Sequence, residues 1–260
     1  MADSEFGEAR FEIGAVISRA FETIGSNIVL FCGLALVLAG IPQFLLGFWQ
    51  ATNIGLNANL VDGSYFFTSA YWTPILVAML VGVVANAILQ ASLTRATVMS
   101  LSGETPQFGP CLAVGISLIL PMIGIGILMG IGLIVGFALL IVPGIILWLV
   151  WSVVTPAYVQ EKIGVFEAFS RSAALTSGSR WRIFLTMLIV LVLIWVLSIP
   201  VSFLNAAMTA TGNLFLVALV GGAVNALYSM LMVAVQASIY VELRQLKEGI
   251  APSDLEAIFA

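Results

Sequence analysis

Six long apolar runs divide this chain, and they limit its fold more than any other feature. They cover residues 27–49, 74–93, 116–140, 145–160, 181–204 and 214–240. A helix needs about 20 apolar residues to cross a hydrocarbon core of roughly 30 Å. Only 8% of the residues are charged, and a soluble domain carries roughly 25%. We therefore predict an all-α polytopic membrane protein with six transmembrane helices, forming a single integral membrane domain over residues 1–260.

The basic residues fall only in alternate connectors between these runs. Two precede the first run, one follows the second, four separate the fourth from the fifth, and two follow the sixth: Arg10, Arg19, Arg95, Lys162, Arg171, Arg180, Arg182, Arg244 and Lys247. Lys and Arg accumulate in cytoplasmic connectors, so we expect these connectors and both termini in the cytoplasm. The acidic start lacks the basic region of a cleavable signal, and we expect it to be retained.

Two polar segments have the periodicity of amphipathic helices. Residues 10–26 place six apolar residues on one face, Ile13, Val16, Ile17, Ala20, Phe21 and Ile24. This stripe would either lie in the membrane interface or pack on the cytoplasmic ends of the protein's own helices. Residues 164–177 form the second predicted interfacial helix, with an apolar face of Val165, Phe166, Phe169 and Ala173 and a water-facing side of Glu167, Ser170 and Arg171. Residues 241–260 are predicted to be a cytoplasmic tail with a short helix.

A weak internal repeat accompanies this pattern. Residues 18–27 and 170–180 are alike and each precede an apolar run, and residues 108–115 hold the same place before the third run. We predict three units, each an interfacial helix plus a two-span hairpin, around a pseudo-threefold axis normal to the membrane. Such repeats would be parallel, because two spans restore the chain direction.

Small residues predict where helices pack closely. Gly33, Gly40 and Gly47 recur every seven residues and are expected on one face. The third run holds two GxxxG patterns, which predict a central helix packed on more than one side; their residues are Gly126, Gly130, Gly132 and Gly136. Gly222 belongs to a stripe of small and polar residues in the sixth run.

Four amides lie within the predicted spans, namely Asn86, Gln90, Asn225 and Gln236. They would either make hydrogen bonds between helices, which we favour, or line a pore. Apart from Arg182 at the start of the fifth run, the runs carry no Asp, Glu, Lys or Arg of the kind that ion-coupled carriers use.

A cationic and aromatic cluster precedes the fifth run. Arg171, Arg180, Trp181 and Arg182 are candidates for binding anionic lipid headgroups. The alternative is that these residues only fix the topology. The carboxylates Glu161, Glu167 and Glu242 lie near span ends and are expected to be solvated.

Several function classes lack the residues they need. The net charge is −4 and the basic residues are scattered, which argues against nucleic acid as a partner. The chain has no histidine and two unpaired cysteines, so neither a disulfide nor a metal site is expected. No nucleophile stands beside a base, and we expect no catalytic residue and no cofactor.

The segment PGIILWLVWSVVTPAYVQEKIGVFEAFSRSAALTSGSRWRIF resembles the membrane domain attached to some bacterial glycerophosphodiester phosphodiesterases, and related stand-alone membrane proteins. The matching positions are Pro143, Gly144, Trp151, Glu161, Gly164, Glu167, Ala168, Ser170, Arg171, Arg180, Trp181 and Arg182. The resemblance implies a multi-pass protein of the bacterial inner membrane. The catalytic barrel of that family uses histidine, and this chain contains none.

We therefore expect a non-enzymatic membrane protein, either lipid-associated or an accessory or scaffold subunit of a membrane assembly. The alternative is an uncoupled transporter or channel for a small or amphiphilic solute. Expected partners are membrane lipid and either a membrane protein or a second copy of the chain.

Overall fold

The computed structural model describes residues 11–54 and 67–249, and within them it contains helices and no strand. The helices are α1 (Ile13–Ser26), α2 (Ile28–Ala35), the π-helix η1 (Leu36–Gly40), α3 (Ile41–Ile54), α4 (Ser69–Leu101), α5 (Phe108–Ser117), α6 (Ile119–Leu139), α7 (Ile141–Val150), α8 (Val154–Glu161), α9 (Val165–Thr176), α10 (Arg180–Ala210) and α11 (Leu214–Glu248). Arg10 and the tail beyond Gly249 lie outside the described residues.

Six of the helical stretches are long and apolar enough to cross a membrane, which confirms the predicted number of spans. They are Ile28–Thr52, Tyr71–Leu101, Ile119–Leu139, Ile141–Glu161, Arg180–Ala210 and Leu214–Glu248. Most of the observed ends differ from the predicted ones: the second stretch continues to Leu101 and the fifth to Ala210, instead of residues 93 and 204. The fourth stretch is broken between α7 and α8, and α11 continues straight through the start of the predicted tail to Glu248.

The tight turn between α6 and α7 lies at Leu140, three residues before the Pro143–Gly144 pair. Leu140 has extended backbone angles, φ −165° and ψ 153°, and α7 begins at the next residue. Pro143 then falls in the first turn of α7, where its missing N–H removes no helical hydrogen bond. Gly144 is buried against α6. A Cβ at Gly136 of α6 would lie 3.2 Å from the Cα of Gly144.

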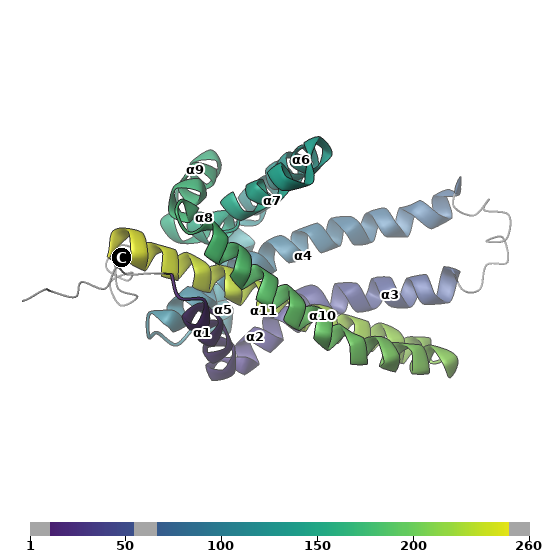
Figure 1. Cartoon of the computed structure of the whole chain (residues 1–260). Helices are drawn as coiled ribbons and strands as arrows, with labels where there is room; N and C mark the ends of the chain where they lie inside the picture. Colours follow the sequence, from purple (N-terminus) through teal and green to yellow (C-terminus); the bar gives the residue numbers. More distant parts are fainter. Residues whose placement is uncertain (1–10, 55–66, 250–260) are drawn as a thin grey trace, which may run out of the picture.

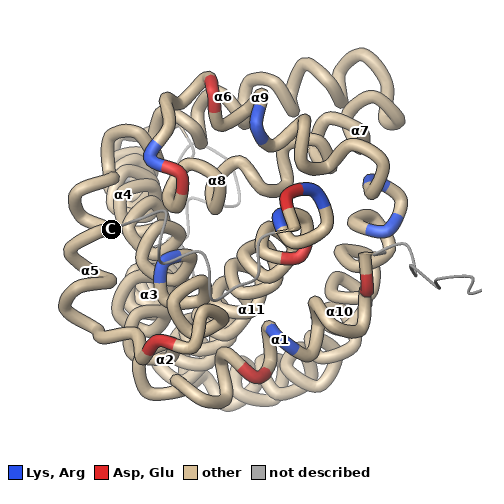
Figure 2. Tube along the Cα trace, turned by 90° about the vertical axis from the view of Figure 1, so that its left-hand side faces the viewer, with Lys and Arg blue, Asp and Glu red and all other residues tan. Residues whose placement is uncertain are grey.

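Helix α11 forms the centre of the molecule, surrounded by the other helices in the end-on view (Figure 2). It contacts α1, α2, η1, α3, α4, α8, α9 and α10. Every residue from Val233 to Arg244 except Gln236 is buried. The expectation that the third span is central is wrong, because α6 has the smallest buried share of the six spans, 17%. Together with α7 it diverges from the α3–α4 pair (Figure 1).

The glycine predictions succeed at some positions and fail at others. Gly40 meets Gly222 and Gly47 meets Ala218 of α11, as close packing requires. Gly33 instead faces Phe108 of α5, because the wider turn of η1 shifts the helical phase between Gly33 and Gly40.

On α6, the two GxxxG pairs behave differently. Cβ atoms at Gly126 and Gly130 would meet nothing within 4 Å, so this pair packs against no helix. Gly132 accommodates the ring of Trp151, and Gly136 packs on Gly144.

The element order contains the three predicted units, since α1, α5 and α9 each precede a hairpin. Their surroundings differ, because the third unit contributes the central α11 and the second the outlying α6. The pseudo-threefold axis stays a prediction.

The first amphipathic helix packs on the protein itself. Val16, Ala20 and Ile24 of α1 are buried, and α1 contacts α11, α10 and α4. Phe21, predicted on the same face, is 46% exposed. The three buried residues support the packing alternative.

The predicted faces of the second amphipathic helix are right in part. Val165 and Phe169 pack against a cluster of buried residues, and Glu167 and Ser170 are exposed, as predicted. Phe166 is 77% exposed, whereas α9 buries Ala168, Ser172, Leu175 and Thr176. The buried hydroxyls are satisfied by backbone carbonyls, since Ser172 donates to Val150 at 2.7 Å and Thr176 to Ser172 at 2.9 Å.

The Lys and Arg residues of the described ranges gather at one end of the molecule. They belong to α1, the last turns of α4, the α8–α9 connector, α9, the first turn of α10 and the last turns of α11. Figure 2 looks onto this end, which we call the charged end.

Candidate functional site

A groove of about 570 Å³ lies between α4 and α6. Met79 and Val83 of α4 and Ile127 of α6 line it, and their side chains are 63%, 40% and 56% exposed. The groove therefore opens sideways to the surface of the spans. Such a volume lies within the range of about 300 to 1,000 Å³ that is usual for small-molecule sites.

Three of the four amides singled out in the sequence converge on this groove. Asn86 and Gln90 come from one face of α4, four residues apart, and Gln236 comes from α11. Ser152 and Thr155 add hydroxyls to the lining. None of the lining residues is charged. The groove thus combines uncharged hydrogen-bonding groups with apolar walls.

The hydrogen bonding of the groove is incomplete. Within the described residues, the Gln90 Oε1 atom is buried and accepts no hydrogen bond. The Asn86 side chain is exposed in the groove. Buried polar atoms are normally satisfied, and an exception at a cavity needs an explanation.

The fourth amide has a structural role. The Asn225 amide donates to the Ala39 carbonyl oxygen in η1 at 3.2 Å. A π-helix disturbs the regular carbonyl pairing, and Asn225 supplies a donor there. Asn225 and Gln236 share nearly one face of α11, but eleven residues separate them by about 16 Å along the axis.

The break between α7 and α8 forms part of the groove lining. Trp151 and Ser152 lie in this break and line the groove. A Cβ at Gly132 would lie 2.3 Å from the Trp151 ring. The same ring packs edge-on against Phe169 of α9, with 5.0 Å between the ring centroids. Trp151 therefore connects α6 to α9, and Gly132 is required to make room for it.

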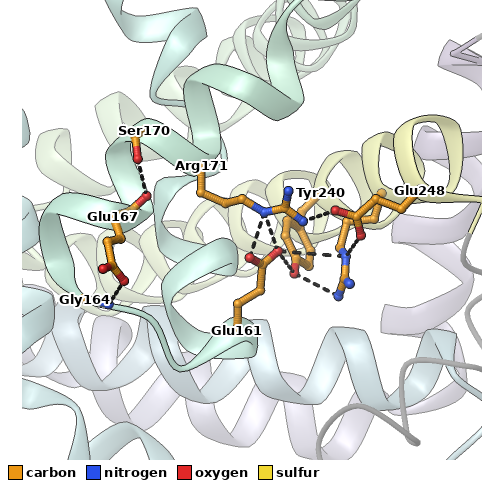
Figure 3. A network of polar contacts seen from close by, with 8 residues as sticks. Glu161, Gly164, Glu167, Ser170, Arg171, Tyr240 and Glu248 are labelled. Atoms are coloured by element: carbon orange, nitrogen blue, oxygen red, sulfur yellow. Dashed lines mark hydrogen bonds and ion pairs between the residues drawn. The ribbon is translucent and has the colours of Figure 1, made fainter.

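A network of ion pairs joins α8, α9 and α11 at the charged end (Figure 3). Arg171 Nε donates to both Glu161 carboxylate oxygens, at 3.0 and 2.7 Å, and its terminal nitrogen pairs with Glu248. Tyr240 donates its hydroxyl to Glu161 at 2.9 Å, and Arg244 pairs with Glu248 at 2.8 Å.

Arg171 is therefore a structural cation. Burial disfavours its charged form, but the hydrogen bonds to Glu161 and Glu248 outweigh burial and raise its pKa.

The four headgroup candidates do not form one site. Arg171 is held in the network, and Arg182 donates to the Phe11 carbonyl oxygen at 3.0 Å. Arg180 and Trp181 are exposed, and Trp181 stacks on Phe184.

The prediction of solvated carboxylates is wrong for two of three. Glu242 is 6% exposed and accepts from the Glu12 N–H at 3.1 Å and from Arg19 at 2.5 Å. Glu161 is in the network. Glu167 is exposed and accepts from the Gly164 N–H at 3.0 Å.

These pairs were missed because α1 and α9 fold back over the end of α11, which linear spacing does not reveal. The only sequence signal was the spacing of Tyr240, Arg244 and Glu248 at four-residue intervals on one helix face.

Within the described residues, no group of three or more Cys, Asp, Glu or His side chains could hold a metal ion.

Comparison with known proteins gives a family and no activity. No curated protein and no solved structure matches this chain. The resemblance to phosphodiesterase membrane domains stays a prediction. The sequence model of one family, described as a domain of unknown function, matches residues 11–243, which is most of the chain. The protein thus belongs to the DUF7847 family.

Proposed function

We propose that this protein is a non-enzymatic, lipid-associated membrane protein that holds an amphiphile in the groove between α4 and α6. The observation that carries the proposal is the groove itself: a sideways opening at span level, apolar walls and a cluster of uncharged amides and hydroxyls.

The polarity of the groove matches that of a lipid in one leaflet. Met79 and Gln90 lie eleven residues apart on α4, about 16 Å along its axis, and both line the groove. Gln90 lies four residues from the middle of the Tyr71–Leu101 span on the side of the charged end, and Met79 lies seven residues beyond the middle toward the other end. An amphiphile with its polar end at Gln90 would therefore direct its chain away from the charged end, toward and past the middle of the span.

We place this leaflet on the cytoplasmic side of a bacterial inner membrane, because the Lys and Arg residues gather at that end. Reporter fusions after Arg95 and after Lys247 should then report the cytoplasm, and a fusion at Gly212 should report the opposite side. A fusion at Gly212 that reports the cytoplasm would overturn this orientation.

The groove can be blocked without disturbing the helix packing. A Cβ at Gly126, which lines the groove, meets nothing within 4 Å. We expect Gly126→Phe to fill the groove from its α6 wall. Gly130→Phe is the matched control, since Gly130 is equally unobstructed, lies one turn away and is not part of the lining.

The test is mass spectrometry of lipid bound to protein purified in a mild detergent. The wild type and Gly130→Phe should retain an amphiphile in stoichiometric amount. Gly126→Phe should retain about tenfold less, as expected from a steric penalty of about 1.4 kcal/mol. A wild type without bound amphiphile, or a Gly126→Phe variant that keeps it, would refute the proposal. A reproducible co-purifying protein would instead favour the scaffold alternative.

One observation favours transport as a second candidate. The break between α7 and α8 lies against the groove, and broken helices line the binding sites of many transporters. Vesicles of phosphatidylcholine with a fluorescent diacylglycerol analogue distinguish the two functions. A transporter would accelerate exchange of the analogue between leaflets, and Gly126→Phe would abolish the acceleration. A lipid-associated protein would leave the exchange rate unchanged.

A further inference from the structure

We infer that the groove selects an amphiphile whose polar end is uncharged and bears a hydroxyl, as in a diacylglycerol, over a phospholipid with the same chains. This inference rests on the proposed function, and it names the ligand class of the same site.

The first argument is the absence of charge from the lining. The residues around the groove include no Lys, Arg, Asp or Glu. Arg95 is not among them, and its guanidinium donates to the Gln160 amide oxygen at 3.4 Å. A phosphate drawn into the groove would lose water without gaining a cation, which is unfavourable in a low-dielectric site. An ammonium group would lack a carboxylate in the same way.

The second argument is the unsatisfied atom of Gln90. Its buried Oε1 lacks a donor, and a phosphodiester offers only acceptors. A hydroxyl both donates and accepts, so it can satisfy Gln90 whichever way the amide is turned. The exposed Asn86 amide in the same groove can donate to an ester carbonyl of the ligand. The polar end of a diacylglycerol contains one hydroxyl and two such carbonyls.

Three probes with identical chains separate the two arguments. Dioleoylglycerol is uncharged and has the hydroxyl. Its acetate ester is also uncharged but has no hydrogen-bond donor. Dioleoyl phosphatidate carries a negatively charged phosphate in place of the hydroxyl. Each is titrated into the purified full chain in detergent and measured by native mass spectrometry. For the wild type, we expect dioleoylglycerol to bind about tenfold more tightly than the acetate, the effect of one hydrogen bond to a buried group. Phosphatidate should bind more weakly than the acetate.

Variants locate the selectivity. In Gln90→Leu, the ratio of the affinity for dioleoylglycerol to the affinity for its acetate should fall close to one. The acetate itself should still bind. Asn225→Leu is the matched control, because its amide bonds to η1 outside the groove, and it should keep the wild-type preference.

The outcomes separate failure of the inference from failure of the proposed function. If the wild type binds none of the probes, or if Gly126→Phe binds them as tightly as the wild type does, the groove is not the binding site and the proposed function fails. Equal binding of all three probes by the wild type refutes only the selectivity, and this comparison needs no variant. A Gln90→Leu variant that keeps the tenfold preference overturns the role assigned to Gln90.

Discussion

Replacing Gly222 by alanine tests how the central helix is packed. A Cβ at Gly222 would lie 2.6 Å from the Gly40 carbonyl oxygen and 3.0 Å from the Phe44 Cβ. The nearest atom belongs to backbone, so the conflict can be relieved only by moving η1 away from α11. The neighbouring Gly221 is the matched control, since a Cβ there would meet nothing within 4 Å.

The expected magnitude follows from two opposing effects. Overpacking costs about 1 to 3 kcal/mol, and alanine in place of glycine favours a helix by up to about 1 kcal/mol. The helical gain is common to both variants, so the packing cost should appear as their difference. With roughly 2 to 4 °C of unfolding temperature per kcal/mol, Gly222→Ala should unfold about 2 to 12 °C below Gly221→Ala.

The assay is thermal unfolding in one detergent at one scan rate, followed by tryptophan fluorescence. Comparing the variants at equal scan rate matters because unfolding of such proteins is often irreversible. Equal unfolding temperatures for the two variants would show that the close approach of η1 and α11 is not as described.

Three further predictions concern polar contacts, each measured as a change in the same unfolding temperature. Arg171→Met leaves Glu161 without its main partner and should lower stability by about 1.5 to 3 kcal/mol; an unchanged unfolding temperature would contradict the network. Glu242→Leu removes the carboxylate partner of Arg19, which keeps its hydrogen bond to the Gln245 amide oxygen, and should destabilise more than Glu242→Gln, which keeps an acceptor; equal effects would speak against the ion pair. Asn225→Leu should cost about 1 kcal/mol while bound lipid is unchanged, and loss of lipid would place this amide in the groove.

The sequence predicts part of the candidate site. Asn86 and Gln90 stand four residues apart, so their common helix face follows from helical geometry. Their meeting with Gln236, and the separate role of Asn225, depend on how α4 and α11 cross, which spacing along one chain does not contain.

The ionic contacts show the same limit. Arg171, Glu161 and Glu242 look like solvated charges at span ends, and the structure brings them together because α1 and α9 fold over α11. A charge near a helix end has the same local signature whether it faces water or a partner.

What the sequence determined by itself is the membrane class, the six spans and the gathering of basic residues in alternate connectors, because each depends on the transfer of a local segment between water and lipid. Only the tertiary structure decided that α11 is central, that α6 lies outside, and that three amides share one groove. In lipid, a helix face that packs inside the protein and a face that contacts lipid are equally apolar. Hydrophobicity therefore does not decide which face is buried. Close contacts between small residues, such as Gly40 and Gly222, decide it.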